Sequence, residues 1–212
     1  LLSSLIACNR MNKTPIVIPH RDLRQKEVDY KAISKSEHTL NDNNCIIQAK
    51  EQNILLKSFA YNEEDIQCVL FTSGTESVPK AVELTFSNIW YSANAWNSVL
   101  NFSIHDNYLN IMPLHHISGL SIFFRSIYFG FKTIYCSYDK EETLKIIHNN
   151  KIDFISVVPK ILLDFMKNEM ASEILKEMKL VLIGGDGVNK NIFDYMQSNK
   201  INSYISYGMT ET

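Results

Sequence analysis

The chain has 212 residues, 45% of them hydrophobic and 21% charged, and its net charge is −2 at neutral pH. This composition predicts a globular protein with a full core, and the nearly balanced charge gives no reason to expect a nucleic-acid partner. The cysteines, Cys8, Cys45, Cys68 and Cys136, form no C-x-x-C pair, so the sequence indicates reduced thiols rather than a zinc site or a disulfide framework. No apolar stretch is long enough to span a membrane, so stable membrane insertion is not expected.

The two parts of the chain differ in character. Residues 20–44 are polar and charged, which predicts a surface connection or a short helix, and residues 41–44 predict a turn. From residue 66 onward, strand-like and helix-like segments alternate. We therefore expect one segment at residues 1–65, a partial N-terminal subdomain with a connection, and a ligand-binding core at residues 66–212.

The core segment predicts an α/β fold. Strands are expected at residues 66–70, 108–112, 132–136, 153–158, 180–183 and 203–207. Helices are expected at residues 87–100 with Ser87 as the N-cap, at 119–128, at 139–149, from Pro159 onward and at 188–197. Core positions on these helices are predicted for Trp90, Trp96, Phe193 and Met196. Alternation of this kind favours largely parallel sheets with flanking helices, in which ligands bind beyond the carboxyl ends of the strands.

The stretch at residues 71–80 follows the first of these strands and reads Phe-Thr-Ser-Gly-Thr-Glu-Ser-Val-Pro-Lys. Hydroxyls, a glycine and a closing ammonium suit polyphosphate, because N–H groups and hydroxyls satisfy the phosphate oxygens and the lysine offsets their charge. The stretch is not a Walker A loop, because G-x-x-x-x-G-K-[ST] is absent. Its spacing alone also fits an ordinary turn.

Three later segments add to this pattern, each at the carboxyl end of an expected strand. Residues 112–120 read Met-Pro-Leu-His-His-Ile-Ser-Gly-Leu, residues 184–187 read Gly-Gly-Asp-Gly, and residues 207–211 read Tyr-Gly-Met-Thr-Glu. In this order, the four motifs resemble the adenylate-forming acyl-CoA synthetase superfamily over about residues 66–212. Phe124-Arg125-Ser126 and residues 155–160 (Ile-Ser-Val-Val-Pro-Lys) look most like its o-succinylbenzoate–CoA ligases of menaquinone or phylloquinone synthesis.

The resemblance implies binding sites for ATP, Mg²⁺ and coenzyme A. The residues implied to hold the β- and γ-phosphates are Thr72, Ser73, Gly74, Thr75 and Lys80. A wall of the adenine pocket is implied for Gly184, Gly185 and Asp186. In the last motif, Tyr207, Gly208 and Met209 would contact the adenine, with the ring of Tyr207 stacked on it. Thr210 would contact the α-phosphate and Glu211 would bind the metal, a hard ion that takes oxygen ligands. Taken alone, this motif also fits an amphipathic core edge and a charge at a helix start.

The resemblance also implies an acyl site. His116 would border the acyl pocket and act in catalysis with Thr210 and Glu211, and Ser118 and Gly119 would line the acyl or coenzyme A channel. His115 is expected to face the opposite way from His116, because adjacent residues of an extended segment point apart. Arg125 either pairs with a substrate carboxylate, which a guanidinium binds bidentately, or is a charge on the helix surface.

The phosphate-binding stretch departs from the family pattern at Glu76, Ser77 and Ala81, where Thr or Ser, Gly and Gly are usual. A carboxylate about 4 Å from a phosphate charge costs about 1 to 4 kcal/mol, so we expect Glu76 to point outward. Loss of the glycine at 77 restricts positive φ.

The resemblance extends to the ends of the chain. Residues 1–11 would end an amphipathic helix before a strand at residues 15–19. The family's hinge and C-terminal domain, with its catalytic lysine, would follow Thr212, so we expect part of a larger enzyme whose 212 residues turn over poorly or not at all alone.

Several alternatives remain open at this stage. The chain fits another acyl-CoA ligase or an amino-acid adenylation domain, and it also fits a nucleotide-binding remnant without catalysis. The expected setting is a bacterial cytoplasm or a plastid stroma, with small-molecule ligands and a possible homo-oligomer.

Overall fold

The computed structural model describes residues 5–6, 8, 14–18, 62–72 and 79–211. The chain divides into two compact units, Leu1–Phe86 and Ser87–Thr212. The assignment of residues 1–65 and 66–212 to separate segments stays a prediction, and the expectations for residues 1–4, 7, 9–13 and 19–61 lie outside the described residues. Within the described part, no helix is long and apolar enough to cross a membrane.

The first unit contains a small mixed sheet in the order β1-β2-β3. Strand β1 (Ile16–Val17) runs parallel to β2 (Ile66–Thr72), and β3 (Lys80–Thr85) runs antiparallel to β2. Strand β3 was not expected from the sequence. Because β3 returns directly along β2, the connection between them starts beyond Thr72 and ends at Lys80, and the register pairs these two residues.

The second unit contains a five-stranded sheet in the order β5-β4-β6-β7-β8, and every neighbouring pair is parallel. The strands are β4 (Asn107–Asn110), β5 (Lys132–Tyr135), β6 (Phe154–Val157), β7 (Leu180–Ile183) and β8 (Ser203–Ile205). The helices are α3 (Phe86–Leu100), α4 (Ile117–Phe129), α5 (Lys140–Asn150), α6 (Pro159–Phe165), α7 (Ala171–Lys176) and α8 (Lys190–Ser198). The predicted α/β architecture with a parallel sheet and flanking helices is confirmed.

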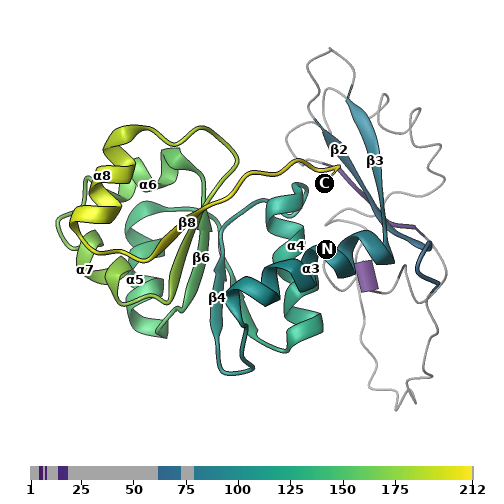
Figure 1. Cartoon of the computed structure of the whole chain (residues 1–212), viewed down its shortest axis with the longest axis horizontal. Helices are drawn as coiled ribbons and strands as arrows, with labels where there is room; N and C mark the ends of the chain where they lie inside the picture. The colour runs from purple at the N-terminus through teal and green to yellow at the C-terminus, as the bar shows by residue number, and fades with distance from the viewer. Residues whose placement is uncertain (1–4, 7, 9–13, 19–61, 73–78, 212) are drawn as a thin grey trace. The chain divides into compact units, whose positions relative to one another are not determined.

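Helices cover both faces of this sheet (Figure 1). Alternate strand residues, such as Leu109, Ile155 and Val181, pack in one cluster with α5, α6, α7 and α8. The residues between them, including Tyr108, pack in a second cluster with Ile122 of α4. This division follows from the strand order, because the β4-to-β5 crossover and the β5-to-β6 crossover run in opposite directions and such connections are right-handed.

Specific caps fix several helix ends. The side chain of Asp139 accepts a hydrogen bond from the N–H of Glu142 at 2.9 Å and begins α5, and Asn189 begins α8 in the same way through Ile192. Pro159 occupies the first turn of α6, as predicted. Gly130 ends α4 with a φ of 74°, a left-handed conformation that suits glycine.

Other predicted boundaries are wrong by one or two residues. Helix α3 begins at Phe86, so Ser87 is not its N-cap. Strand β4 ends at Asn110 rather than at residue 112, because the side-chain oxygen of Asn110 accepts the N–H of Met112. Helix α4 begins at Ile117, two residues before the expected start, and α7 was not expected.

Two of the four predicted core residues on the helices are exposed. Met196 is buried and Trp96 is half-buried, but Phe193 is 54% exposed and Trp90 is 37% exposed. Phe193 instead lines a shallow apolar pocket between α8 and β8.

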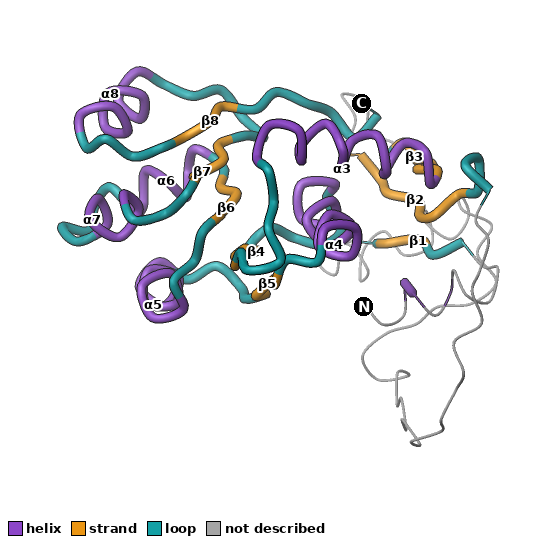
Figure 2. The backbone as a smooth tube through the Cα atoms, turned by 60° about the horizontal axis from the view of Figure 1, so that its bottom comes forward, coloured by secondary structure: helices purple, strands orange, loops and turns teal. Residues whose placement is uncertain are grey.

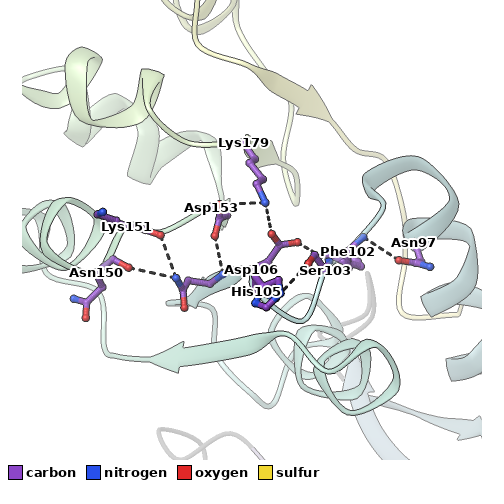
Figure 3. Close-up of polar contacts among 10 residues, drawn as sticks. Asn97, Phe102, Ser103, His105, Asp106, Asn150, Lys151, Asp153 and Lys179 are labelled. Carbon is purple, nitrogen blue, oxygen red and sulfur yellow. Dashed lines mark hydrogen bonds and ion pairs between the residues drawn. The ribbon is translucent and has the colours of Figure 1, made fainter.

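A charged network joins the amino ends of three neighbouring strands (Figure 3). Asp106 precedes β4, Asp153 precedes β6 and Lys179 precedes β7. The ammonium of Lys179 bonds to the carboxylate of Asp106 and lies 3.4 Å from that of Asp153. Asp153 accepts the N–H of Asn107 at 2.8 Å, and Asp106 accepts the N–H of Ser103 at 2.7 Å. The network therefore fixes the relative register of β4, β6 and β7 at the edge opposite the sequence motifs.

We predict that Asp106→Asn lowers the free energy of unfolding by about 2 kcal/mol, because it removes the charge from a carboxylate that is 1% exposed and paired. Urea unfolding at neutral pH measures this change. The Asp106 bond raises the pKa of Lys179, so the stabilisation is present below pH 10.5, the ordinary pKa of lysine, and is lost as the pH rises through the raised value. Lys167→Met, which breaks an exposed pair with Asp164, serves as the control and leaves the midpoint unchanged. An unchanged midpoint for Asp106→Asn would show that the network does not stabilise the sheet.

Candidate functional site

The sequence motifs of the second unit meet at one edge of the five-stranded sheet. Because all five strands are parallel, the segments that follow β4, β6, β7 and β8 leave from the same side (Figure 2). Residues 111–116 follow β4, residues 184–187 follow β7 and residues 206–211 follow β8. Between β4 and β6 the connections turn to opposite faces, which forms the switch point where such sheets bind ligands.

The segment after β4 is a tight turn held against the start of α4. The N–H of His116 donates to the carbonyl of Pro113 at 3.1 Å, and the carbonyl of His116 accepts from Gly119 and Leu120. A Cβ atom on Gly119 would lie 2.5 Å from the Pro113 oxygen and 2.6 Å from the Met112 oxygen. Only glycine permits this close approach, so Gly119 is required by packing.

The turn brings the two histidines together. Their ring centroids are 4.3 Å apart, so the expectation that they face opposite ways is wrong. That expectation assumed an extended backbone, whereas residues 113–116 form a hydrogen-bonded turn. Burial lowers the pKa of His116, which is therefore neutral at pH 7 and offers one nitrogen as donor and one as acceptor.

Asn110 fixes this turn and was missed in the sequence. Its side-chain nitrogen donates to the Gly119 carbonyl at 2.9 Å, and its side-chain oxygen accepts from the N–H of Met112 at 3.0 Å. Asn110 is buried, so neither bond competes with water. The only sequence sign of this role is a polar residue at the end of an apolar strand.

The glycine segment after β7 lies beside the chain that follows β8. A Cβ atom on Gly184 would lie 2.4 Å from the hydroxyl oxygen of Ser206, and Gly185 has a φ of 83°. The Ser206 N–H bonds to the Ile183 carbonyl at 2.8 Å, and Asp186 accepts the N–H of Gly187 at 2.7 Å. The structure thus brings residues 184–187 next to the segment that begins at Ser206.

The last motif presents polar and aromatic groups at the surface of this unit. Tyr207 is 93% exposed and Met209 is 51% exposed. Glu211 is also exposed, and Thr210 is half-buried. A bare aromatic ring next to a glycine segment suits stacking on a flat ligand, because covering it removes apolar surface from water.

The phosphate-binding stretch belongs to the first unit. Thr72 ends β2 and Lys80 begins β3 directly opposite, so the hydroxyl and the ammonium stand at the same end of the hairpin. Ser73, Gly74, Thr75, Glu76 and Ser77 lie outside the described residues. Ala81 pairs with Phe71 in the sheet.

Arg125 is buried between α4 and its neighbours, so the interpretation as a surface charge is wrong. It is 6% exposed, and its Nε atom has no hydrogen-bond partner. In the part of the chain that the structure describes, no carboxylate forms an ion pair with it. Its guanidinium carbon lies 5.0 Å from the ring centroid of Trp96. Burial lowers the pKa of Arg125 to about 10, and the nearby Tyr108 opposes this shift.

Metal ligands are sparse in the described residues. No group of three or more His, Cys, Asp or Glu side chains could hold a metal ion there. Mg²⁺ commonly keeps waters and takes one or two carboxylates together with substrate phosphates. Glu211 alone therefore fits a magnesium ion that arrives with a nucleotide, but not a resident metal centre.

Comparison with known proteins shows that the chain is similar to described enzymes. Residues 5–212 match the family described as AMP-binding enzyme. The 2-succinylbenzoate–CoA ligase of Staphylococcus aureus strain MSSA476 is 33% identical over 177 residues, or 83% of this chain and 35% of that protein. The ligase of strain MRSA252 is 35% identical over 161 residues, or 76% of this chain and 32% of that protein. This chain therefore spans about a third of the length of these relatives.

Solved structures of O-succinylbenzoate coenzyme A synthetase (MenE) from Bacillus subtilis have the same fold. The complex with ATP and magnesium ion has a TM-score of 0.84 at 21% identity, over 99% of this chain and 47% of that chain. The complex with AMP has a TM-score of 0.82 at 23% identity, over 100% of this chain and 47% of that chain.

We predict that Gly119→Ala disrupts the turn after β4, because its Cβ would overlap two backbone carbonyls. The variant should lose about 2 kcal/mol or more of stability, against the gain of about 1 kcal/mol that alanine normally brings to a helix. Thermal unfolding measures the loss, and His116 should move in the histidine NMR spectrum. Gly187→Ala is the matched control, since its Cβ would meet nothing within 4 Å. Equal effects of the two variants would contradict the close approach at Gly119.

Proposed function

Because this chain belongs to the family of AMP-binding enzymes, we propose that the protein activates a carboxylate with ATP and transfers the acyl group to coenzyme A. The proposed acid is 2-succinylbenzoate, which is named in the relatives at 33% and 35% identity. The acid and ATP form an acyl-adenylate and pyrophosphate, and the thiol of coenzyme A then displaces AMP. This assigns the protein to menaquinone synthesis in a bacterial cytoplasm. The relatives named above are bacterial and lend no support to a plastid.

The observation that carries the proposal is the common edge of the motif segments. A flat adenine needs an aromatic face and a close backbone, and these are offered by Tyr207 and by the glycines at 184 and 185 on the neighbouring strand. An acid to be activated needs a pocket beside the nucleotide, and the switch point lies two strands away, next to the turn of His116. One parallel sheet therefore carries the residues that we propose for the adenine and for the acid.

The proposed chemistry depends on positioning and on charge neutralisation. A carboxylate oxygen of the acid attacks the α-phosphorus, and the bond to the pyrophosphate oxygen breaks. The Thr210 hydroxyl donates to an oxygen of the α-phosphate. Glu211 would hold Mg²⁺, which would offset phosphate charge when bound. The leaving pyrophosphate is bound by Thr72, Ser73, Gly74, Thr75 and Lys80.

The nucleoside and the acyl group occupy the remaining motif residues. Tyr207 stacks on the adenine, with Gly208 and Met209 beside it. The opposite wall is formed by Gly184, Gly185 and Asp186. His116, Ser118 and Gly119 border the acyl and coenzyme A channel, where a neutral His116 can share hydrogen bonds with the acid without adding charge.

Arg125 supports an acid with two carboxylates. A buried guanidinium without a carboxylate partner in the described residues is costly, and a pKa of about 10 corresponds to about 3 kcal/mol. A second carboxylate on the substrate would neutralise it through bidentate hydrogen bonds. Because 2-succinylbenzoate has one carboxylate on its ring and one on its succinyl chain, one can bind Arg125 while the other reacts.

Exchange of labelled pyrophosphate into ATP tests this function on the protein made from the complete reading frame that contains this chain. We expect exchange that requires 2-succinylbenzoate, and Glu211→Gln should slow it about 100-fold. Glu177→Gln, an exposed carboxylate at the end of α7, is the control and should leave the rate unchanged. Exchange with an amino acid or another acid, but not with 2-succinylbenzoate, would replace the proposed substrate. No exchange with any acid, together with ATP binding, would indicate a nucleotide-binding remnant.

We predict that Arg125→Met weakens 2-succinylbenzoate binding about 30-fold or more yet raises the free energy of unfolding by about 1 to 2 kcal/mol, because it removes a buried unpaired charge. Calorimetric titration and urea unfolding measure the two effects. In the unmodified protein, affinity should stay constant from pH 7 to 9, since the guanidinium is protonated there, and fall as the pH rises through about 10.

Lys145→Met on the exposed surface of α5 is the control and should change neither affinity nor stability. If Arg125→Met destabilised the fold and left affinity unchanged, Arg125 would be a structural residue instead.

A further inference from the structure

Trp96 belongs to none of the sequence motifs, yet its ring lies against Arg125, the one buried arginine of the described residues. We propose that Trp96 is a positioning residue: its indole holds the Arg125 guanidinium in one plane, so that the N–H groups of the guanidinium donate to a rigid aromatic carboxylate in preference to a flexible aliphatic one. This inference depends on the proposed role of Arg125 and adds the residue that sets its selectivity.

The geometry leaves Arg125 with few other supports. Its guanidinium carbon lies 5.0 Å from the centroid of the Trp96 ring, within the range of a cation–π contact. The Nε atom is buried without a hydrogen-bond partner. An arginine has a long side chain with several rotatable bonds, so without an anchoring partner its plane would not be fixed. In the described residues, the indole is the group seen to anchor it.

The sheet residue near Arg125 is Tyr108 of β4, a neutral group. The hydroxyl of Tyr108 lies 2.7 Å from the hydroxyl of Ser156, and both side chains are buried. Burial raises the pKa of Tyr108, so it stays neutral at physiological pH and cannot act as the counter-ion. In the part of the chain that the structure describes, Arg125 therefore has the Trp96 ring at 5.0 Å and the neutral Tyr108 nearby, and we expect the ligand to supply the anion.

A fixed guanidinium selects the shape of its ligand. Bidentate pairing makes the carboxylate coplanar with the guanidinium, so holding one plane fixes the other. A carboxylate attached to an aromatic ring then fixes the direction of the whole ring. A carboxylate on a flexible chain gains less binding free energy from the same pairing, because its chain must lose rotational freedom to bring the carboxylate into that plane. Of the two carboxylates of 2-succinylbenzoate, the one on the ring suits Arg125 and leaves the succinyl carboxylate free to react.

Helix α3 offers a matched control. Trp90 lies on the same helix and pairs edge-on with Tyr128 at 5.0 Å between ring centroids, whereas Trp96 lies over Arg125. Both are tryptophans on a partly exposed helix, so loss of either removes a similar apolar area. Only loss of Trp96 should change the orientation of the Arg125 guanidinium.

The first experiment needs no ligand. In the NMR spectrum of the full protein, the Nε–H of Arg125 should carry a ring-current shift that is lost in Trp96→Leu, partly kept in Trp96→Phe and kept in Trp90→Leu. Arg125→Met assigns the resonance. If Trp96→Leu left the shift unchanged, the indole would not hold the guanidinium and the proposal would be overturned.

The second experiment compares two acids, 2-succinylbenzoate and 4-oxo-4-phenylbutanoate, which lacks only the ring carboxylate. Trp96→Leu should weaken binding of the first about 10-fold and leave binding of the second unchanged, and Trp96→Phe should lie between. Arg125→Met should abolish the preference, and adding Trp96→Leu to it should cause no further loss. Equal weakening of both acids, or additive losses in the double variant, would overturn the proposal. Binding is measured here without turnover, so failure of pyrophosphate exchange would count against the proposed function and not against this assignment.

Discussion

The handedness of two crossovers determines which face of the sheet each helix covers and where the topological switch point lies. The chain leaves β4 for α4 on one face of the sheet and returns through β5 to α5 on the other face. Right-handed connections allow no other arrangement once the strand order is 5-4-6-7-8. The two hydrophobic clusters then bury alternate residues of the same strands on opposite faces. The topological switch point of the sheet therefore lies between β4 and β6, and the turn of His116 lies beside it because it is the segment that leaves β4.

Most of this architecture could be predicted because strands in a parallel sheet are buried on both faces. Strand β7 reads Leu-Val-Leu-Ile and was located to the residue, since every position is buried and glycines follow. Predicted strand ends were wrong where a side chain, instead of a neighbouring strand, accepts a backbone N–H. The side-chain oxygen of Asn110 accepts the N–H of Met112 in this way. Strand β3 was missed because it pairs with β2 as a hairpin, which interrupts the alternation of strands and helices that describes the rest of the chain. The prediction that Trp90 and Phe193 are core residues was wrong, because the size and apolarity of a side chain do not show which face of its helix a neighbouring element covers.

For the motifs of the second unit, the sequence predicted their position at one edge of the sheet but not the contacts of their side chains. The carboxyl ends of β4, β7 and β8 follow from strand order, so His116, Gly184 and Tyr207 could be assigned to one edge. The roles of the glycines differ in a way that only coordinates reveal. Gly119 is required by its close approach to two backbone carbonyls and Gly185 by its positive φ. Gly184 faces the hydroxyl of Ser206, a side chain that can move, and Gly187 and Gly208 meet no neighbour. These different roles of the five glycines cannot be distinguished from the residue type alone.

Arg125 shows why a site can depend on residues that no motif contains. Its position on α4 fits a surface charge or a buried ligand equally well, and the choice depends on its neighbours Trp96 and Tyr108, which come from α3 and β4. Each of the two is a plain core or strand residue when considered alone. Together they leave the cation beside groups that cannot neutralise it. A fold that keeps such a cation sacrifices stability, and binding of an anionic group is the physical gain that can offset that loss.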